Sequence, residues 1–151
     1  MTGNLTLISR NQYGMPGNGQ SILPTISGDG RRVAFTSVAA LVPKDGPASA
    51  YDIYVKDLTA GALILASETG DGVQANGSSF GGVISADGSH VGFQSFAETL
   101  SPDDANGGLT DVFLATLGPL EGPRRNQWSG YTDGRVARET TGSAADWATT
   151  C

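Results

Sequence analysis

The stretch of sequence that decides the fold is ISGDGRRVAFTS at residues 26–37, which returns as ISADGSHVGFQS at residues 84–95. In both copies an Asp-Gly turn separates a short apolar strand from a strand in which valine and phenylalanine occupy alternate positions. Asp-Gly favours a tight hairpin because glycine adopts a positive φ without a steric penalty. Alternation with a period of two places valine and phenylalanine on one face of the strand. The stretch therefore predicts a β-hairpin that occurs twice.

The repetition extends well beyond this hairpin. Residues 5–37 match residues 63–95 at a constant offset of 58, with 14 identities in 33 positions. After a one-residue insertion, residues 41–58 match residues 100–117 at an offset of 59. Self-similarity at such a period is typical of solenoids, propellers and other repeat architectures. Because no window in residues 1–118 shows a helical period, we expect an all-β fold.

Each repeat is predicted to hold four short strands, which we name a to d. In the first repeat they are residues 23–27, 32–37, 52–57 and 63–67, and in the second repeat strands a to c are residues 81–85, 90–95 and 111–116. Residues 5–9 match strand d, so that the chain reads d-abcd-abc. This order predicts two four-stranded antiparallel propeller blades. Blade one spans about residues 21–67, and blade two spans about residues 79–117 and is completed by the strand at residues 4–9.

Two blades do not close a ring, since propellers usually have four to eight. The chain is therefore part of a longer propeller, or it forms a ring with copies of itself, or it stays an open pair of sheets with exposed apolar surface. The repeat domain ends near residue 117. The pattern is absent from residues 118–151, and we expect an irregular or disordered tail there.

Composition excludes several classes of protein. The net charge of −6 argues against nucleic acid as a partner, because phosphate binding needs clustered lysine and arginine. No apolar run approaches the length of a membrane span. The only cysteine, Cys151, excludes an internal disulfide and a cysteine-based metal site. We find no signal peptide at the start of the sequence.

The two hairpin sequences resemble the bacterial TolB-type, WD-like β-propeller repeat. The signature of that family is a Ser-Pro-Asp-Gly or Ser-Ala-Asp-Gly turn before a strand with valine and phenylalanine. A subgroup continues with an acidic loop and an Asp-Val-Phe strand, which residues 41–54 and 100–113 resemble. The resemblance implies a protein-interaction platform or a domain beside an enzyme, and a periplasmic or secreted location.

The repeated acidic loop is the best candidate for a binding site. Its second copy, residues 103–111, is rich in the oxygen ligands and flexible glycines that suit Ca²⁺, although the spacing is not that of an EF-hand. The alternative is that the aspartates bond backbone amides and hold turns. The candidate calcium ligands are Asp45, Asp52, Asp104, Asn106 and Asp111.

Catalytic signals are weak. Residues 77–81 match the Gly-x-Ser-x-Gly nucleophile elbow around Ser79, but that motif needs a strand–turn–helix context and a histidine partner. The only histidine, His90, lies in a predicted strand and aligns with Arg32, so we interpret it as a solvated side chain. Asp29 and Asp87 are assigned to the hairpin turns.

We therefore expect a non-enzymatic β-propeller module or fragment that acts as an interaction scaffold. Its partner is another protein or a further copy of the chain, which completes the propeller. The alternatives are the propeller part of a larger hydrolase whose catalytic residues lie outside this chain, and a calcium-stabilised structural repeat.

Overall fold

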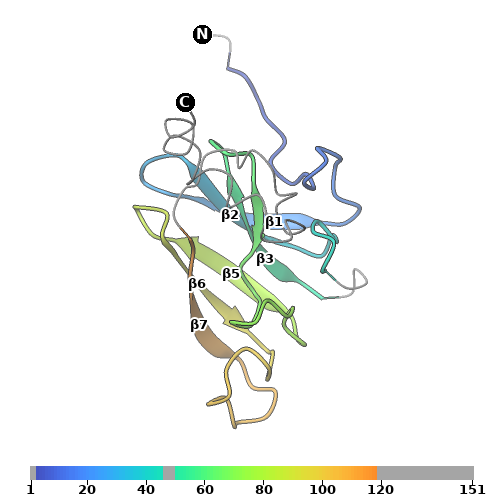
Figure 1. Cartoon of the computed structure of the whole chain (residues 1–151), viewed down its shortest axis with the longest axis vertical. Helices are drawn as coiled ribbons and strands as arrows, with labels where there is room; N and C mark the ends of the chain where they lie inside the picture. Colours follow the sequence, from blue (N-terminus) through green and yellow to red (C-terminus); the bar gives the residue numbers. More distant parts are fainter. Residues whose placement is uncertain (1–2, 46–49, 119–151) are drawn as a thin grey trace, which may run out of the picture.

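The computed structural model describes residues 3–45 and 50–118, which form seven strands in two antiparallel sheets and no helix (Figure 1). The first sheet has the order β1-β2-β3-β4 and the second has the order β5-β6-β7. The prediction of an all-β fold with two antiparallel sheets is confirmed. The strands of the first sheet are β1 (Ser21–Ile26), β2 (Arg32–Ser37), β3 (Asp52–Asp57) and β4 (Leu63–Leu65), and those of the second are β5 (Ser79–Ile84), β6 (His90–Ser95) and β7 (Asp111–Thr116).

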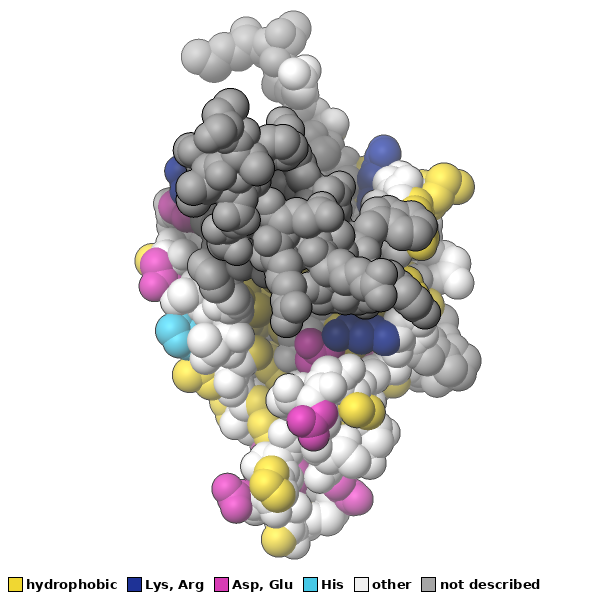
Figure 2. All heavy atoms as spheres, viewed as in Figure 1, with side chains coloured by type: hydrophobic (Ala, Val, Ile, Leu, Met, Phe, Trp, Pro, Cys, Tyr) yellow, Lys and Arg dark blue, Asp and Glu magenta, His cyan; other side chains and the backbone are white. Residues whose placement is uncertain are grey.

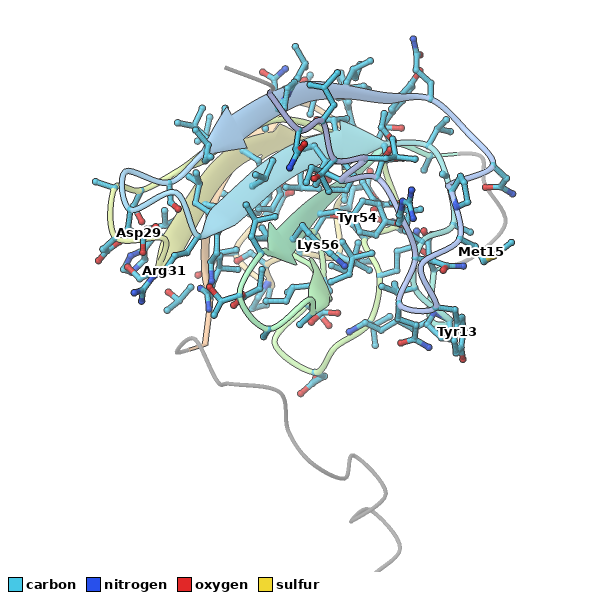
Figure 3. The ribbon with its side chains drawn as sticks, turned by 90° about the horizontal axis from the view of Figure 1, so that it is seen from above. Tyr13, Met15, Asp29, Arg31, Tyr54 and Lys56 are labelled. Atoms are coloured by element: carbon cyan, nitrogen blue, oxygen red, sulfur yellow. The ribbon has the colours of Figure 1, made fainter. Side chains whose placement is uncertain are left out.

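The two Asp-Gly hairpins form as the sequence predicts. In the first, the Asp29 carboxylate accepts hydrogen bonds from the Ser27 hydroxyl at 2.6 Å and from the Arg31 amide at 3.0 Å. Figure 3 shows Asp29 and Arg31 at this turn. Asp87 accepts the same two kinds of bond in the second hairpin, from the Ser85 hydroxyl and the Ser89 amide. These bonds lower the pKa of both aspartates, and the Ser27 and Ser85 hydroxyls are the main cause.

The first strand of each sheet contains a register break that the sequence reading did not anticipate. In β1 the pairing with β2 shifts between Ile22 and Thr25, and in β5 the pairing with β6 shifts between Phe80 and Val83. The breaks coincide with positive φ angles at Leu23 (52°) and at Gly81 (69°), which are aligned positions of the repeat. Because pairing resumes on the far side of each break, both strands begin two residues earlier than predicted.

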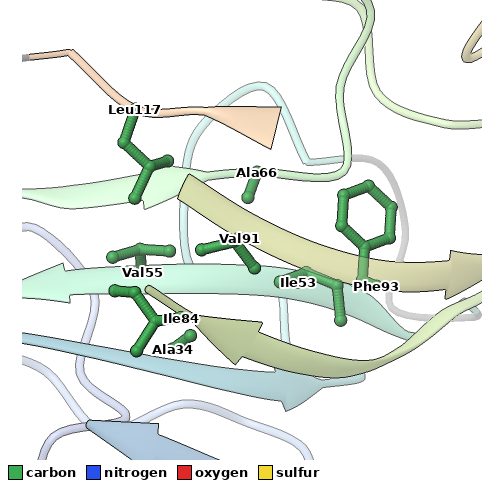
Figure 4. Close-up of a cluster of buried hydrophobic side chains, with 8 residues drawn as sticks. All are labelled: Ala34, Ile53, Val55, Ala66, Ile84, Val91, Phe93 and Leu117. Carbon is green, nitrogen blue, oxygen red and sulfur yellow. The ribbon is translucent and has the colours of Figure 1, made fainter. Parts of the chain in front are cut away.

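The two sheets stack face to face and enclose one hydrophobic cluster between them (Figure 4). The approach is close at β5, where a Cβ on Gly82 would lie 2.9 Å from Cγ2 of Ile53. Thr25 also spans the interface, because its hydroxyl donates to the Gly82 carbonyl oxygen at 2.9 Å. The cluster consists of Ala34, Ile53, Val55, Ala66, Ile84, Val91, Phe93 and Leu117.

A buried arginine also joins the two sheets. Arg32, in β2, is 3 % exposed, and its guanidinium donates to the carbonyl oxygens of Gly88 at 2.7 Å and Gly118 at 2.8 Å. Its Nε lies 3.7 Å from a carboxylate oxygen of Asp57, in the same sheet. Three groups from two sheets thus surround one charged side chain.

A second hydrophobic cluster covers the far face of the first sheet. Its buried members are Val33, Phe35, Ala39, Leu41, Tyr54 and Leu65, and Ile8 from the N-terminal segment packs against them.

Two pairs of aromatic rings show that the sequence repeat is also a repeat of three-dimensional structure. The rings of Phe35 and Tyr54 lie 5.8 Å apart, and those of Phe93 and Phe113, at the aligned positions, lie 5.9 Å apart.

The N-terminal segment departs from the sequence prediction. Residues 4–9 were expected to complete the second sheet, but they form no strand, and the second sheet has three strands in the order β5-β6-β7. The segment lies beside the first sheet instead, because Ile8 joins its far cluster and a Cβ on Gly17 would lie 2.9 Å from Cδ2 of Leu41 in that cluster. The predicted tail from residue 119 onward lies outside the described residues.

Candidate functional site

The first acidic loop is a closed network of hydrogen bonds. The Asp45 carboxylate accepts bonds from the Tyr54 hydroxyl and from the Gln74 side-chain amide. The Asp52 carboxylate accepts bonds from the Ser67 hydroxyl and from the same amide, both at 2.8 Å. All four carboxylate oxygens therefore have donors within the protein. The donors to Asp45 and Asp52 are side chains, and not the backbone amides that the alternative to calcium binding assigned to them.

Burial governs the ionisation of this network. Asp52 is 1 % exposed, and the loss of solvent raises the pKa of its carboxyl to about 6, with a smaller contribution from the charge on Asp45. Burial and the bond to Asp45 together raise the pKa of the Tyr54 hydroxyl far above its usual range. The Tyr54 side chain, labelled in Figure 3, also donates to the Ala39 carbonyl oxygen at 3.1 Å. The hydroxyl thus remains a donor at every physiological pH.

The second acidic loop lacks these partners. Asp104 and Asp111 align with Asp45 and Asp52, but Tyr54 is replaced by Phe113, which has no hydroxyl. Asn106 donates to the Asp111 carboxylate at 2.9 Å, whereas a buried carboxylate oxygen of Asp104 has no hydrogen-bond partner. The second set of predicted ligands thus lies on one loop and on the first residue of β7, and one oxygen of Asp104 has no donor.

An open pocket of about 520 Å³ adjoins this loop. In the first repeat the equivalent space holds Ser67 and Gln74, which follow β4. Within the part of the chain that the structure describes, the pocket thus marks the place where the second sheet has no strand like β4 and no loop after it. Its lining consists of Ser101, Asp103, Asp104, Ala105, Asn106, Asp111, Val112 and Phe113.

The described residues contain no group of three or more histidine, cysteine, aspartate or glutamate side chains placed to hold a metal ion. In the second loop the Asp111 carboxylate accepts a bond from the Asn106 side-chain amide, and Oδ1 of Asp104 has no donor. The loop is therefore better described as an incomplete hydrogen-bond network than as a preformed cage of ligands.

The Gly-x-Ser-x-Gly motif has a structural role in the fold. Ser79 is fully buried, and its hydroxyl donates to Oγ of Ser95 at 2.9 Å. The aligned pair Ser21 and Ser37 forms the same bond at 2.9 Å. His90 begins β6 and Ser95 ends it, so the histidine lies about 16 Å from the Ser79 hydroxyl along the strand. The structure therefore does not bring the predicted motif and the only histidine together.

The outward face of the second sheet exposes apolar side chains whose aligned residues are buried in the first sheet. Val112 and Leu114 of β7 are 85 % and 70 % exposed, whereas their aligned residues in the first sheet, Ile53 and Val55, are 0 % exposed. Val83 of β5 adds to this face and is 63 % exposed. Figure 2 shows hydrophobic side chains reaching the surface in the lower half of the view, where the second sheet lies in Figure 1.

The edge of β7 is open as well. In the first sheet the aligned strand, β3, pairs with β4 through the register Tyr54 with Leu65 and Val55 with Ile64. Among residues 3–45 and 50–118 no strand pairs with β7 on that side. The backbone groups of Val112 and Leu114 point away from β6, because strand neighbours alternate between the two edges. A strand edge of this kind is a template for pairing with another chain.

Sequence reasoning missed two features of this region and predicted a third only in general terms. It did not identify Arg32 as a link between the sheets, because the aligned residue is histidine. It also missed Gln74, which lies in a loop with no strand pattern. The exposed face of β7 was foreseen only as a general consequence of an incomplete ring.

No family model matches the sequence, and neither does any curated protein. Within the described ranges, no helix has the length and apolar character needed to cross a membrane.

Proposed function

We propose that the two sheets are successive blades of a β-propeller of the TolB type and that the chain is a non-enzymatic interaction module. The outward face and open edge of the second sheet form its binding surface. The chemistry of that surface fits an extended polypeptide strand backed by an apolar sheet. The proposed ligand is therefore a protein segment rather than a small molecule.

One observation carries this proposal. The same two positions of the repeat are fully buried at Ile53 and Val55 and largely exposed at Val112 and Leu114. Burying two aliphatic side chains of this size stabilises an interface by about 3–5 kcal/mol. The first sheet shows how that burial is achieved, through β4 at its edge and the second sheet on its face.

The second acidic loop supports the same proposal. Asp104 has a buried oxygen without a donor, and a buried polar group in that state costs about 1–3 kcal/mol. A strand that carries a hydroxyl and an amide, as residues 62–75 do, supplies donors of the required kind. The buried position of Ser79 and its distance from His90 support a module without a catalytic serine.

A peptide of residues 62–75 with Glu68→Arg tests the proposal, because unchanged Glu68 would face Asp103, the acidic residue that aligns with its partner Lys44. It contains the strand, serine and glutamine that complete the first sheet, and we expect it to bind to the β7 edge of the intact chain. Nuclear magnetic resonance should show slower hydrogen exchange at the amides of Val112 and Leu114 when the peptide is added.

A matched peptide with Asp in place of Leu65 is the control, because it keeps the length and removes an apolar contact of the strand. If neither peptide changes exchange in β7, or if both do so equally, the proposed binding surface is incorrect.

A further inference from the structure

The N-terminal segment packs against the first sheet in the same way that the residues around β4 pack against the second sheet. Ile8 packs against the cluster of Val33 and Phe35, just as the aligned Ala66 packs against the cluster of Val91 and Phe93. The loops that follow are alike. The Gly17 amide donates to the Ser9 carbonyl at 3.1 Å, and the Ala75 amide donates to the Ser67 carbonyl at 3.0 Å. Residues 4–10 are thus held in the position of a fourth strand whose own sheet is not among the described residues.

The segment at residues 4–10 has solvent-exposed apolar side chains. Leu5 is fully exposed and Leu7 is 47 % exposed, although the aligned Leu65 is 2 % exposed within the first sheet. Tyr13 and Met15, in the loop that follows, are also exposed (Figure 3). Among residues 3–45 and 50–118, the segment at residues 4–10 thus has no sheet to pair with, and the second sheet has no fourth strand.

The first sheet shows how such a segment completes a sheet. Leu65 lies opposite Tyr54 in the register, and the Ser67 hydroxyl donates to the Asp52 carboxylate at 2.8 Å. Applied to the second repeat, the same register places Leu7 opposite Phe113 and the Ser9 hydroxyl on the Asp111 carboxylate. The three residues that define this strand are identical in the two segments, as Leu5 with Leu63, Leu7 with Leu65 and Ser9 with Ser67.

Charge complementarity points to the same pairing. In the first repeat Lys44 forms an ion pair with Glu68, the residue after Ser67. The residue aligned with Lys44 is Asp103, and the residue aligned with Glu68 is Arg10. Both signs are reversed, so the pair stays attractive only when Arg10 faces Asp103. Pro16 replaces Gln74 and has no side-chain donor, so residues 4–10 offer the Ser9 hydroxyl to Asp111 and Arg10 to Asp103, while Asp104 gains no equivalent of the Gln74 amide.

The far face of the first sheet has an apolar pocket in which exposed β7 side chains of another polypeptide could pack. A pocket of about 170 Å³ there is lined mainly by Ile8, Ile22, Pro24, Val33 and Phe35. Val33 and Phe35 align with Val91 and Phe93, which cover Ile53 and Val55 inside the molecule. The aligned partners for the pocket are therefore Val112 and Leu114, the two exposed residues of the second sheet.

We infer that a second copy of this chain occupies the binding surface. Residues 4–10 of one copy pair with β7 of a second copy. The outward face of the second sheet in that second copy covers the far face of the first sheet in the first copy. The contact is head-to-tail, since the two surfaces differ and lie at opposite ends of the stack. This inference rests on the proposed binding surface and adds the identity of its occupant.

Two charge reversals test the inference. Arg10→Asp places two acidic residues in the contact, and Asp103→Arg places two basic residues there. By sedimentation velocity over a range of concentrations, we expect the unchanged chain to associate and each variant alone to associate at least about fivefold more weakly. An equal mixture of the two variants should associate like the unchanged chain, because every contact then joins opposite charges. Recovery on mixing is specific to a contact between copies.

Leu114→Asp extends the test to the apolar face. Leu114 is 70 % exposed in the single chain, so the variant should fold normally and lose association. Val73→Asp is the matched control, because Val73 is 61 % exposed but lies in a loop of the first sheet outside the contact. Circular dichroism checks that both variants keep their strand content.

The outcomes separate this inference from the proposed function. A chain that remains a monomer at every concentration, or variants whose mixture recovers nothing, overturns the second copy as partner. If the peptide of residues 62–75 still binds β7 in that case, the binding surface stands and another protein is its occupant. Association that Leu114→Asp leaves unchanged also overturns the inference.

Discussion

The guanidinium of Arg32 in the first sheet donates to the carbonyl oxygen of Gly88 in the second sheet, at 2.7 Å. Gly88 lies in the Asp-Gly turn and has a φ of 71°. The hairpin that defines the repeat therefore also provides an acceptor for the buried arginine of the preceding repeat. This bond links the stability of the two sheets.

Replacing Arg32 tests this link. We expect Arg32→Met to lower the free energy of unfolding by about 3 kcal/mol, because it leaves Asp57 buried without its cation and the Gly88 carbonyl without its donor. Urea denaturation followed by circular dichroism measures the change. Arg31→Met is the control, since Arg31 is exposed on the hairpin and its loss should change stability by no more than about 0.5 kcal/mol. Equal effects of the two substitutions would show that Arg32 does not join the sheets.

Two glycines of the second sheet, Gly82 and Gly92, allow a substitution and its control to be compared. A Cβ at Gly82 would lie 2.9 Å from Ile53, so Gly82→Ala should destabilise the fold by about 1–3 kcal/mol through overpacking. A Cβ at Gly92 meets nothing within 4 Å, and alanine is more favourable than glycine within a strand. Gly92→Ala should therefore leave stability unchanged or raise it slightly, as thermal unfolding can show. A harmless Gly82→Ala would mean that the sheets are farther apart than the structure places them.

The pKa of Asp52 predicts an unusual pH dependence. Its folded-state pKa of about 6 lies above the ordinary 3.8, so at pH 5 the folded state holds a proton that the unfolded state has released. The contribution of this group to stability is fully present below about pH 4 and is lost as the pH rises through 6. After allowance for partial screening by solvent, the loss amounts to about 2 kcal/mol. Asp52→Asn should remove it, and denaturation curves between pH 4 and 8 measure it.

Asp29→Asn is the control for that measurement. The Asp29 pKa is lowered in the fold, mainly by the Ser27 hydroxyl, so its contribution is present above pH 4 and is lost only in acid. The variant should therefore keep the pH dependence of the unchanged chain between pH 5 and 7. The same curve for the unchanged chain and for Asp52→Asn would contradict the assignment.

Calcium gives a further test of the acidic loops. Because the four carboxylate oxygens of Asp45 and Asp52 already accept bonds from the protein, we expect the first loop to take up no ion. Calorimetry with calcium and with EDTA should then give the same melting temperature. A higher melting temperature with calcium that disappears in Asp111→Asn would instead assign an ion to the second loop.

Local sequence patterns predicted most of the strands, because each depends on neighbouring residues. The strands at residues 32–37, 52–57, 90–95 and 111–116 have the predicted bounds. Their alternating apolar residues and Asp-Gly turns act over a few positions and leave little choice of register. The starts of β1 and β5 were missed because a positive φ at Leu23 has no local signal, although its aligned residue is Gly81.

The contacts of the site were harder to predict, since they join residues far apart in the chain. Nothing near Asp52 indicates that Gln74 will bond to it, because the loop that carries Gln74 is placed by β4 and not by its own sequence. Arg32 is a similar case. Its alignment with His90 suggested a solvent-exposed position. The second sheet covers Arg32, whereas no described sheet covers His90, which is only half-buried.

The position of Arg32 has a consequence for the growing chain on the ribosome. A nascent chain that ends before Gly88 can already form β1 to β4, yet its arginine lacks the two carbonyl oxygens that surround it in the finished fold. Proteins emerge from the ribosome N-terminus first. Until residues 88 and 118 have emerged, the guanidinium of Arg32 in the first sheet therefore lacks two of its hydrogen-bond acceptors. Folding of the first sheet should therefore become complete only after residue 118 leaves the exit tunnel.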